Sequence, residues 1–192
     1  MAETVHTPTA ILDCATASLR EHPFDDISYR ALGDAVGVSE RTVYRHFPTR
    51  SHLLEALGQR LEETEFPLGA FVTIPEFIDA AKARFRAFDE APAFAFVCAR
   101  AASLSPTGQP EPTFFTRTIL AMLETAHPSL NTRDLHRVAA ALRYFAAAQF
   151  WARMRSGFDM DALEISEVFE RTVMQALDDL PTGTHDVKAR RR

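Results

Sequence analysis

The residues most able to do chemistry lie in the run SERTVYRHFPTR, at positions 39–50. At about 100° per residue, Val43 and Phe47 share one face of a short helix. Arg41 and Arg45 fall on the opposite face. An α-helix fits the major groove of B-DNA, where arginine can donate two hydrogen bonds to guanine O6 and N7. The spacing therefore indicates a helix that reads base edges, although a helical hairpin with a solvated basic face would show the same pattern.

The elements around this run must hold its outer face in place. Ser28 and Ser39 are good N-caps, so a helix is predicted to begin after each of them. Gly37 lies where the first of these helices must stop, since glycine adopts a positive φ there without steric cost. Gly33 is small where the two helices must cross closely. Pro48 is poorly tolerated inside a helix, so the second helix should end just before it.

The motif from Gly37 to Leu54 resembles the DNA-binding signature of the TetR (tetracycline-repressor-like) family of bacterial transcriptional regulators. It reads Gly-Val-Ser, then Thr-Val-Tyr-Arg-His-Phe-Pro-Thr-Arg, then Leu-Leu. The segment before it resembles the family's first helix, so the resemblance covers roughly residues 8–57. The chain departs from the usual pattern at Pro23 and at Leu32-Gly33, which bear on packing rather than on DNA contact.

Eight residues are predicted to contact DNA or to end the elements that do. Arg41 and Arg45 are the expected base readers, and Thr42, Tyr44 and Arg50 are the expected phosphate contacts. The two capping serines also reach phosphate, and the histidine ends the recognition helix on its packing side. The full set is Ser28, Ser39, Arg41, Thr42, Tyr44, Arg45, His46 and Arg50.

Composition and charge narrow the class of protein. The chain has 192 residues, of which 46% are hydrophobic, and a net charge of −5. Residues 1–62 hold six arginines, no lysine and nine acidic residues, which argues against a nonspecific nucleic-acid coat protein. No apolar run is long enough to span a membrane, and no signal peptide begins the chain. With two cysteines that make no disulfide framework, a cytoplasmic location is expected.

Patterns typical of enzymes and metal proteins are missing from the sequence. No His, Cys or carboxylate group has zinc spacing, and no glycine-rich turn could hold a phosphate or a dinucleotide. We therefore expect no metal, no cofactor and no enzymatic activity.

Helical periodicity continues to the end of the chain and predicts an all-α protein of about nine helices. A three-helix unit with a linking helix should occupy residues 1–62, and a ligand-sensing and dimerisation domain residues 63–181. Residues 182–192 are expected to form a disordered basic tail. The predicted helices span about 8–21, 28–35, 39–47, 49–64, 92–104, 113–126, 131–155 and 159–180, with one more that opens at Pro75 and runs through Phe88 and with Gly157 ending the eighth helix.

The second half of the chain is expected to have a function beyond folding, because a helix-turn-helix does not need an added helical domain in order to fold. Of 15 phenylalanines, 13 follow residue 63, and each is best interpreted as part of a packed core. Alanine runs favour close packing of helices 131–155 and 159–180 with a second copy, and a homodimer would read a palindromic operator. The resemblance implies such a homodimer, acting as a repressor that a small-molecule inducer releases.

Six residues are predicted to line the inducer's cavity. Arg100 follows an apolar run, and if buried it needs an acidic partner or an anionic ligand. Trp151 fits a core or interface position equally well. The six residues are Phe96, Arg100, Phe115, Met122, Tyr144 and Trp151.

Two other functions fit the same sequence. One is a dimeric DNA-bound regulator without a ligand. The other is an all-helical small-molecule-binding protein or enzyme whose helix-turn-helix is only architectural, which the outward Arg41 and Arg45 disfavour.

Overall fold

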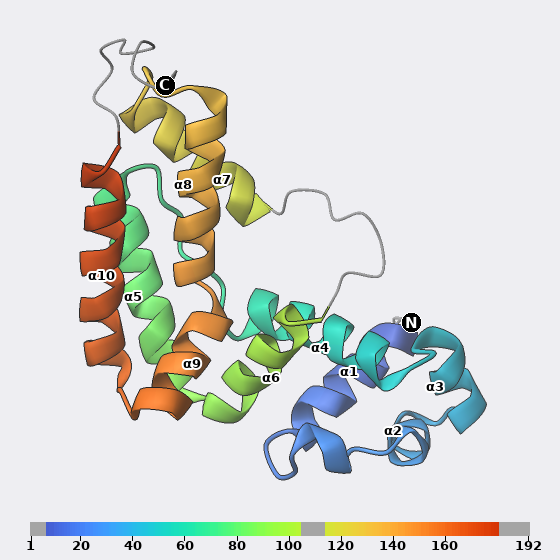
Figure 1. Ribbon diagram of the computed structural model, residues 1–192. Helices are drawn as coiled ribbons and strands as arrows, with labels where there is room; N and C mark the ends of the chain where they lie inside the picture. The colour runs from blue at the N-terminus through green and yellow to red at the C-terminus, as the bar shows by residue number, and fades with distance from the viewer. Residues whose placement is uncertain (1–6, 105–113, 181–192) are drawn as a thin grey trace, which may run out of the picture.

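The computed structural model describes residues 7–104 and 114–180, and it is helical throughout these two ranges. Figure 1 shows α1–α3 at one end and the bundle of α5, α8 and α10 at the other, with α4 and α6 between them. The predicted all-α fold with an N-terminal helix-turn-helix is confirmed. The helices are α1 (Thr7–Ser18), the 3-10 helix η1 (Phe24–Asp26), α2 (Tyr29–Val36), α3 (Glu40–His46), α4 (Arg50–Thr64), α5 (Ile74–Glu90), α6 (Pro92–Ala102), α7 (Phe114–Ala126), α8 (Thr132–Phe145), α9 (Ala148–Phe158) and α10 (Ala162–Asp178).

A small apolar core holds α1–α3 together and continues into α4. Ile11 of α1, Leu32 of α2 and Val43 of α3 are almost fully buried. Leu53 and Leu57 of α4 are buried beside them, and α4 packs against α1. Three short helices bury little surface by themselves, so α4 closes a core that they could not complete alone.

Helices α4 and α6 cross at Gly58. A Cβ atom at this position would lie 2.3 Å from the Cβ of Ala101, so only glycine lets the two helices approach so closely. The thiol of Cys98 lies 3.7 Å from the Gly58 carbonyl oxygen at the same crossing. This crossing joins the N-terminal helices to the rest of the chain.

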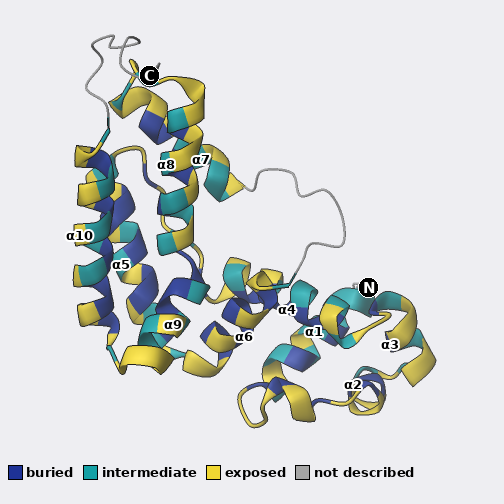
Figure 2. Cartoon of the chain, in the orientation of Figure 1, coloured by how far each residue is buried: buried dark blue, intermediate teal, exposed yellow. Residues whose placement is uncertain are grey.

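Phenylalanine rings fill the centre of the C-terminal helices. Phe85 of α5 packs edge-on against Phe169 of α10, with ring centres 5.3 Å apart. Phe77 lies 5.8 Å from the same Phe169 ring. Figure 2 shows buried positions along the inner faces of α5 and α10 and exposed positions on the outer face of α10. The interpretation as core is confirmed for these rings, whereas Phe96, Phe114 and Phe158 are exposed.

Polar side chains cap six of the ten described α-helices, and the predicted caps Ser28 and Ser39 are two of them. Asn131 accepts a hydrogen bond from the Asp134 amide, and Asp161 forms a reciprocal capping box with Glu164. Thr73 begins α5 in the same way. These side chains occupy backbone donors that a helix start leaves without partners, so they fix where each helix begins.

The prediction of one helix over residues 131–155 is wrong, because the helix is interrupted at Ala146 and Ala147. Both alanines are buried, and Ala147 adopts an extended conformation between α8 and α9. Periodicity did not reveal this break because alanine is the strongest helix former, so the alanine run favoured a continuous helix. The described ranges therefore hold ten α-helices, where about nine were predicted for the chain.

Other boundaries also differ from the prediction. Helix α9 ends at Phe158, and Asp159, with φ of 55°, takes the left-handed turn expected of Gly157. Aspartate tolerates this conformation better than most residues. Helix α1 ends at Ser18, short of the predicted residue 21. The predicted tail at 182–192 lies outside the described residues. None of the described helices is both long and apolar enough to cross a membrane.

Candidate functional site

The turn between α2 and α3 has the geometry that its glycines indicate. Gly37 adopts φ of 74°, and the amide of Val38 donates to the Gly33 carbonyl at 2.9 Å. A Cβ at Gly33 would lie 2.7 Å from the Val38 carbonyl oxygen, so the close approach requires glycine there. The predicted cap at Ser28 is confirmed, since its hydroxyl accepts from the Ala31 amide at 3.1 Å.

Helix α3 presents the predicted faces. Val43 and Phe47 at its end are buried, whereas Arg41 and Arg45 are exposed on the outer side. Ser39 caps the helix by accepting from the Thr42 amide at 3.2 Å. An exposed basic face on a short, rigidly held helix is the arrangement that enters a DNA groove.

Tyr44 is held by an aromatic contact that was not predicted. Its ring lies 4.6 Å from the ring of Tyr29, which is buried at the start of α2. The Tyr29 hydroxyl donates to the Thr49 carbonyl at 2.8 Å, and burial raises the pKa of that hydroxyl. Tyr29 therefore ties α3 to the start of α4 and leaves Tyr44 half exposed toward the outer face.

Arg50 has a structural role that the sequence did not reveal. Its guanidinium donates to the backbone carbonyls of Phe24 and Ile27 and lies 4.3 Å from the centre of the Phe24 ring. These contacts fasten η1 to the N-terminus of α4. Phosphate contact by Arg50 stays a prediction, and it would have to use the donors that these carbonyls leave free.

His46 lies on the packing side of α3, as expected. Its Nε2 atom is buried and has no hydrogen-bond partner among the described residues. A ring held in this position contributes packing at the end of the helix, away from Arg41 and Arg45.

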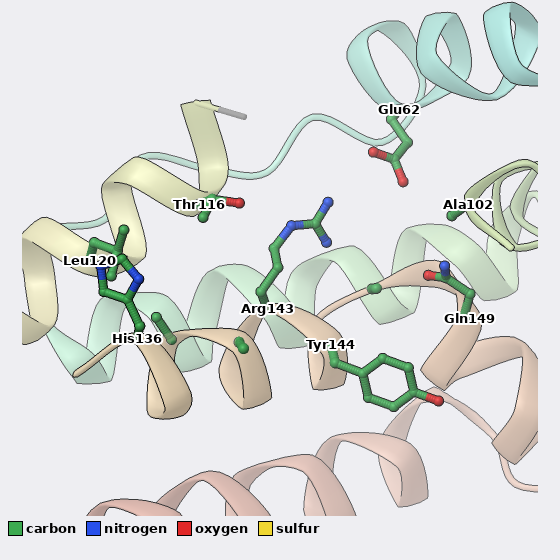
Figure 3. Close-up of a pocket in the computed structure, with 11 residues that line it drawn as sticks. Glu62, Ala102, Thr116, Leu120, His136, Arg143, Tyr144 and Gln149 are labelled. Atoms are coloured by element: carbon green, nitrogen blue, oxygen red, sulfur yellow. The ribbon is translucent and has the colours of Figure 1, made fainter. Parts of the chain in front are cut away.

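A second candidate site is a cleft of about 540 Å³ between α4, α6, α7 and α8. Figure 3 shows the guanidinium of Arg143 projecting into it, with the carboxylate of Glu62 facing from α4. Alanines and Leu120 supply most of its apolar wall. The lining residues are Glu62, Ala102, Thr116, Leu120, His136, Ala139, Ala140, Arg143, Tyr144, Ala147 and Gln149. The part of the chain that the structure describes has no cluster of three metal-ligating side chains.

Around this cleft, the arginine side chains outnumber the carboxylate that pairs with them. Arg84 of α5 is buried, with 4% of its side chain exposed, and lies 3.4 Å from Glu62. The same Glu62 is the acidic group that acts on Arg143, whose pKa is lowered by burial and by Arg84 and raised by Glu62. Two arginines therefore depend on one carboxylate.

The six residues predicted to line a cavity lie in three different places. Tyr144 lines the cleft, and the ring of Phe115 lies 4.6 Å beneath the guanidinium of Arg143. Phe96 and Arg100 line another hollow of about 450 Å³, against the segment around η1.

The sequence required an acidic partner or an anionic ligand for Arg100 only if Arg100 were buried, and it is not. About half of its side chain is exposed, and it pairs with Asp25 at 2.9 Å, which lowers the pKa of that carboxyl. Met122 and Trp151 are buried in the core, where the indole of Trp151 donates to Asp89 at 2.8 Å.

Sequence reasoning missed the charged residues of the cleft. Glu62, Arg84 and Arg143 each lie within a predicted helix, where a charged residue is ordinarily on the solvent side. The available signal was their place within otherwise apolar stripes, since Arg143 follows the buried Ala139 by one helical turn.

The N-terminal part of the chain matches a known family. Residues 11–57 match the family described as bacterial regulatory proteins, tetR family. The nucleoid occlusion factor SlmA of Shewanella baltica is 39% identical over 54 residues, which cover 28% of this chain and 27% of SlmA. SlmA of a Marinomonas species is 40% identical over 58 residues, covering 30% and 29%. The chain thus spans under a third of the length of the curated relatives it matches.

Solved structures resemble the chain over nearly its whole length. A TetR transcriptional regulator from Rhodococcus sp. RHA1 aligns with a TM-score of 0.65 at 16% identity, covering 91% of this chain and 98% of that one. NalD of Pseudomonas aeruginosa, the secondary repressor of the MexAB-OprM multidrug efflux pump, aligns with a TM-score of 0.52 at 16% identity, covering 88% and 96%. At this identity the likeness shows a shared fold.

Proposed function

We propose that this chain, whose residues 11–57 match the TetR family of bacterial regulatory proteins, is a ligand-released transcriptional repressor. It binds a palindromic operator as a homodimer, and a small molecule in the cleft between α4 and α8 releases it. The observation that carries the proposal is helix α3, which buries Val43 and Phe47 and exposes Arg41 and Arg45.

The eight predicted residues divide into three roles at the DNA. Arg41 and Arg45 read base edges, because arginine alone offers the fork that matches guanine. Thr42 and Tyr44 lie on the flanks of the same helix and contact phosphates. The capping serines and Arg50 hold the helix ends against the DNA backbone, and His46 packs on the inner side of α3.

Dimerisation involves α8 and α10. Helix α10 carries the exposed apolar side chains Leu163 and Met174 on its outer face, and Tyr144 of α8 is exposed where α8 borders the cleft. A palindromic operator requires two copies of α3 about 34–36 Å apart, one turn of B-DNA, and a two-fold dimer is the arrangement that can provide them. In this division, residues 1–62 read DNA and residues 63–181 pair and sense the ligand.

Release requires that the ligand prefer a conformation that fits the operator poorly. Operator DNA must then weaken ligand binding by the same factor by which the ligand weakens operator binding. The cleft supports this proposal, because Glu62 on α4 lines it and α4 also closes the core of the DNA-binding helices. As a DNA-bound regulator the protein would act in the bacterial cytoplasm, at the nucleoid.

A second candidate is a DNA-bound factor that needs no ligand. The SlmA relatives favour it, since they are nucleoid occlusion factors and match the DNA-binding part. The charged cleft favours the ligand-released regulator instead, because a purely dimerising domain has no use for a hollow lined with Arg143 and Glu62.

A gel-shift titration tests the proposal. Purified protein would be titrated against DNA from upstream of its own gene, with random DNA in excess. A shift that survives the competitor is expected. Equal affinity for the upstream and random DNA, together with no site enriched from a random-sequence library, would contradict sequence-specific regulation.

A further inference from the structure

Within the part of the chain that the structure describes, Arg143 is a cation without a fixed partner inside the cleft. Its guanidinium lies over the Phe115 ring and projects into the open space, as Figure 3 shows. Among the described residues, none forms a hydrogen bond or an ion pair with it within the distances that define these contacts. Burial lowers the pKa of Arg143, which means that water is partly excluded from its charged form. A desolvated charge without a partner is costly, so a cleft that keeps one is suited to a ligand that supplies the missing charge.

The neighbouring carboxylate does not neutralise this charge. Of the described residues that line the cleft, Glu62 is the only acidic one, and it already lies 3.4 Å from the buried Arg84. The Nε atom of Arg84 is itself buried without a partner among the described residues. Two guanidinium groups and one carboxylate leave one positive charge in the cleft, carried at its accessible side by Arg143.

The rest of the wall is suited to an apolar body. Leu120 and the alanines of α6 and α8 form a smooth surface beside Arg143, and Tyr144 and Gln149 offer polar groups at its edge. A volume of about 540 Å³ lies within the range of roughly 300–1,000 Å³ that small-molecule sites occupy. A ligand with two negative charges would leave one of them facing Glu62 without a cation, whereas one negative charge balances the cleft.

Resting on the proposed function, we propose that the releasing ligand is a small, mainly apolar monocarboxylate whose carboxylate oxygens each accept a hydrogen bond from Arg143. The guanidinium lies over the Phe115 ring, 4.6 Å from its centre, and its planar fork can donate two parallel hydrogen bonds to one carboxylate. The apolar part then lies along Leu120 and the alanines of α8, and Glu62 is left to pair with Arg84 alone.

The test compares carboxylates with uncharged molecules of the same shape. Benzoate, phenylacetate, hexanoate and octanoate would each be paired with the corresponding amide and titrated calorimetrically into the full-length protein. At least one carboxylate is expected to bind roughly tenfold or more tightly than its amide, because charge-assisted hydrogen bonds add about that much. Amides that bind as tightly as their carboxylates, or no binding by any carboxylate at millimolar concentration, would overturn the proposal.

Variants locate the subsite. Arg143→Gln should abolish the preference for carboxylate over amide, and Arg143→Lys should keep part of it, because lysine retains the charge without the fork. Arg133→Gln, on the exposed face of the same helix, is the matched control and should keep the full preference. An Arg143→Gln protein that folds and still prefers the carboxylate tenfold would overturn the assignment. If the glutamine variant does not fold, an undiminished preference in Arg143→Lys would overturn it instead.

Operator binding separates this proposal from the function on which it rests. Carboxylates that bind through Arg143 without weakening operator binding would leave the subsite standing and refute ligand release. Release of the operator only by uncharged molecules, with Arg143→Gln released equally well, would support ligand release and overturn the carboxylate subsite.

Discussion

Arginine residues in this protein perform three different tasks, and their surroundings decide which. Arg45 is exposed on a rigid helix and free to meet a base. Arg50 is committed to the Phe24 and Ile27 carbonyls. Arg143 faces a cleft with no partner within the described residues. Because exposure and local acceptors differ, arginine is proposed to read a base at position 45, ties two backbone carbonyls at position 50, and is proposed to bind a ligand at position 143.

Replacing Arg45 with alanine should weaken operator binding by about 1–3 kcal/mol and relax specificity at one base pair, because two hydrogen bonds to a base edge are lost. Binding isotherms on single-base-pair variants of the operator measure both effects. Arg86→Ala, an exposed arginine on α5, is the control and should bind as the wild type does. Equal loss on operator and random DNA would contradict base reading.

Replacing Arg50 with alanine should lower stability by about 1–3 kcal/mol, since the two buried carbonyls lose their charged donors. Arg50→Lys should recover little of this, because lysine lacks the fork that reaches both oxygens. Urea unfolding with operator titration of the folded fraction separates the two roles. Unchanged stability with weakened DNA binding would return Arg50 to the role of a pure phosphate contact.

The thiol of Cys98 should resist alkylation in the folded protein. Burial raises its pKa to about 12, well above the usual value of about 8.5, so almost no thiolate exists at mildly alkaline pH. In a Cys14→Ser variant, native labelling at about pH 8.5 is expected to be far slower than labelling in denaturant. Equal rates in both conditions would show that the α4–α6 crossing opens readily.

At the scale of elements, the crossing of α4 and α6 is the tightest packing contact between the two ends of the molecule. Gly58 permits it, since any side chain there would strike Ala101. Arg100 and Asp25 add an exposed ion pair across the neighbouring gap. The position of the DNA-binding helices relative to the cleft therefore depends on one glycine more than on charges.

Gly58→Val should destabilise the protein by about 1–3 kcal/mol or more, because a branched side chain must force α4 and α6 apart. Gly157→Ala is the matched control, as a Cβ there makes only ordinary contacts with Arg153. That change should be neutral or stabilise by up to about 1 kcal/mol, because alanine favours a helix. Thermal unfolding of the two variants gives the comparison, and equal melting temperatures would refute the tight crossing.

The predictability of these elements follows from how local their causes are. Caps such as Ser28 and Ser39 act within one helical turn, so the sequence alone located the starts of α2 and α3. The bend at Ala146 and Ala147 depends on what packs around it and left no local mark. The cleft was not predicted for the same reason, because Glu62 and Arg143 are brought together only by the packing of α4 and α8.

At the scale of the whole molecule, the acidic net charge of −5 is combined with a basic reading face. We expect such a protein to bind random DNA weakly and to depend on local contacts for its operator. In the proposed dimer, two recognition helices would supply the affinity that one cannot. The outer faces of α8 and α10 are where the second copy is proposed to pack.

Met174→Lys, on the exposed face of α10, should shift the protein from dimer to monomer and weaken operator binding, because a charge is placed in the proposed interface. Val72→Lys places the same charge at an exposed apolar position before α5 and should leave the dimer intact. Sedimentation velocity distinguishes the two. A Met174→Lys protein that remains dimeric would remove this face of α10 from the interface.

Selection of binding sites from a random DNA library tests the central claim most directly. The account predicts that the wild-type protein enriches an inverted repeat, with half-sites one helical turn or a multiple of it apart. Arg45→Ala should lose the preference at one symmetric position in each half-site. Selection that enriches no motif at any of several salt concentrations would contradict the claim that this chain is a sequence-specific regulator.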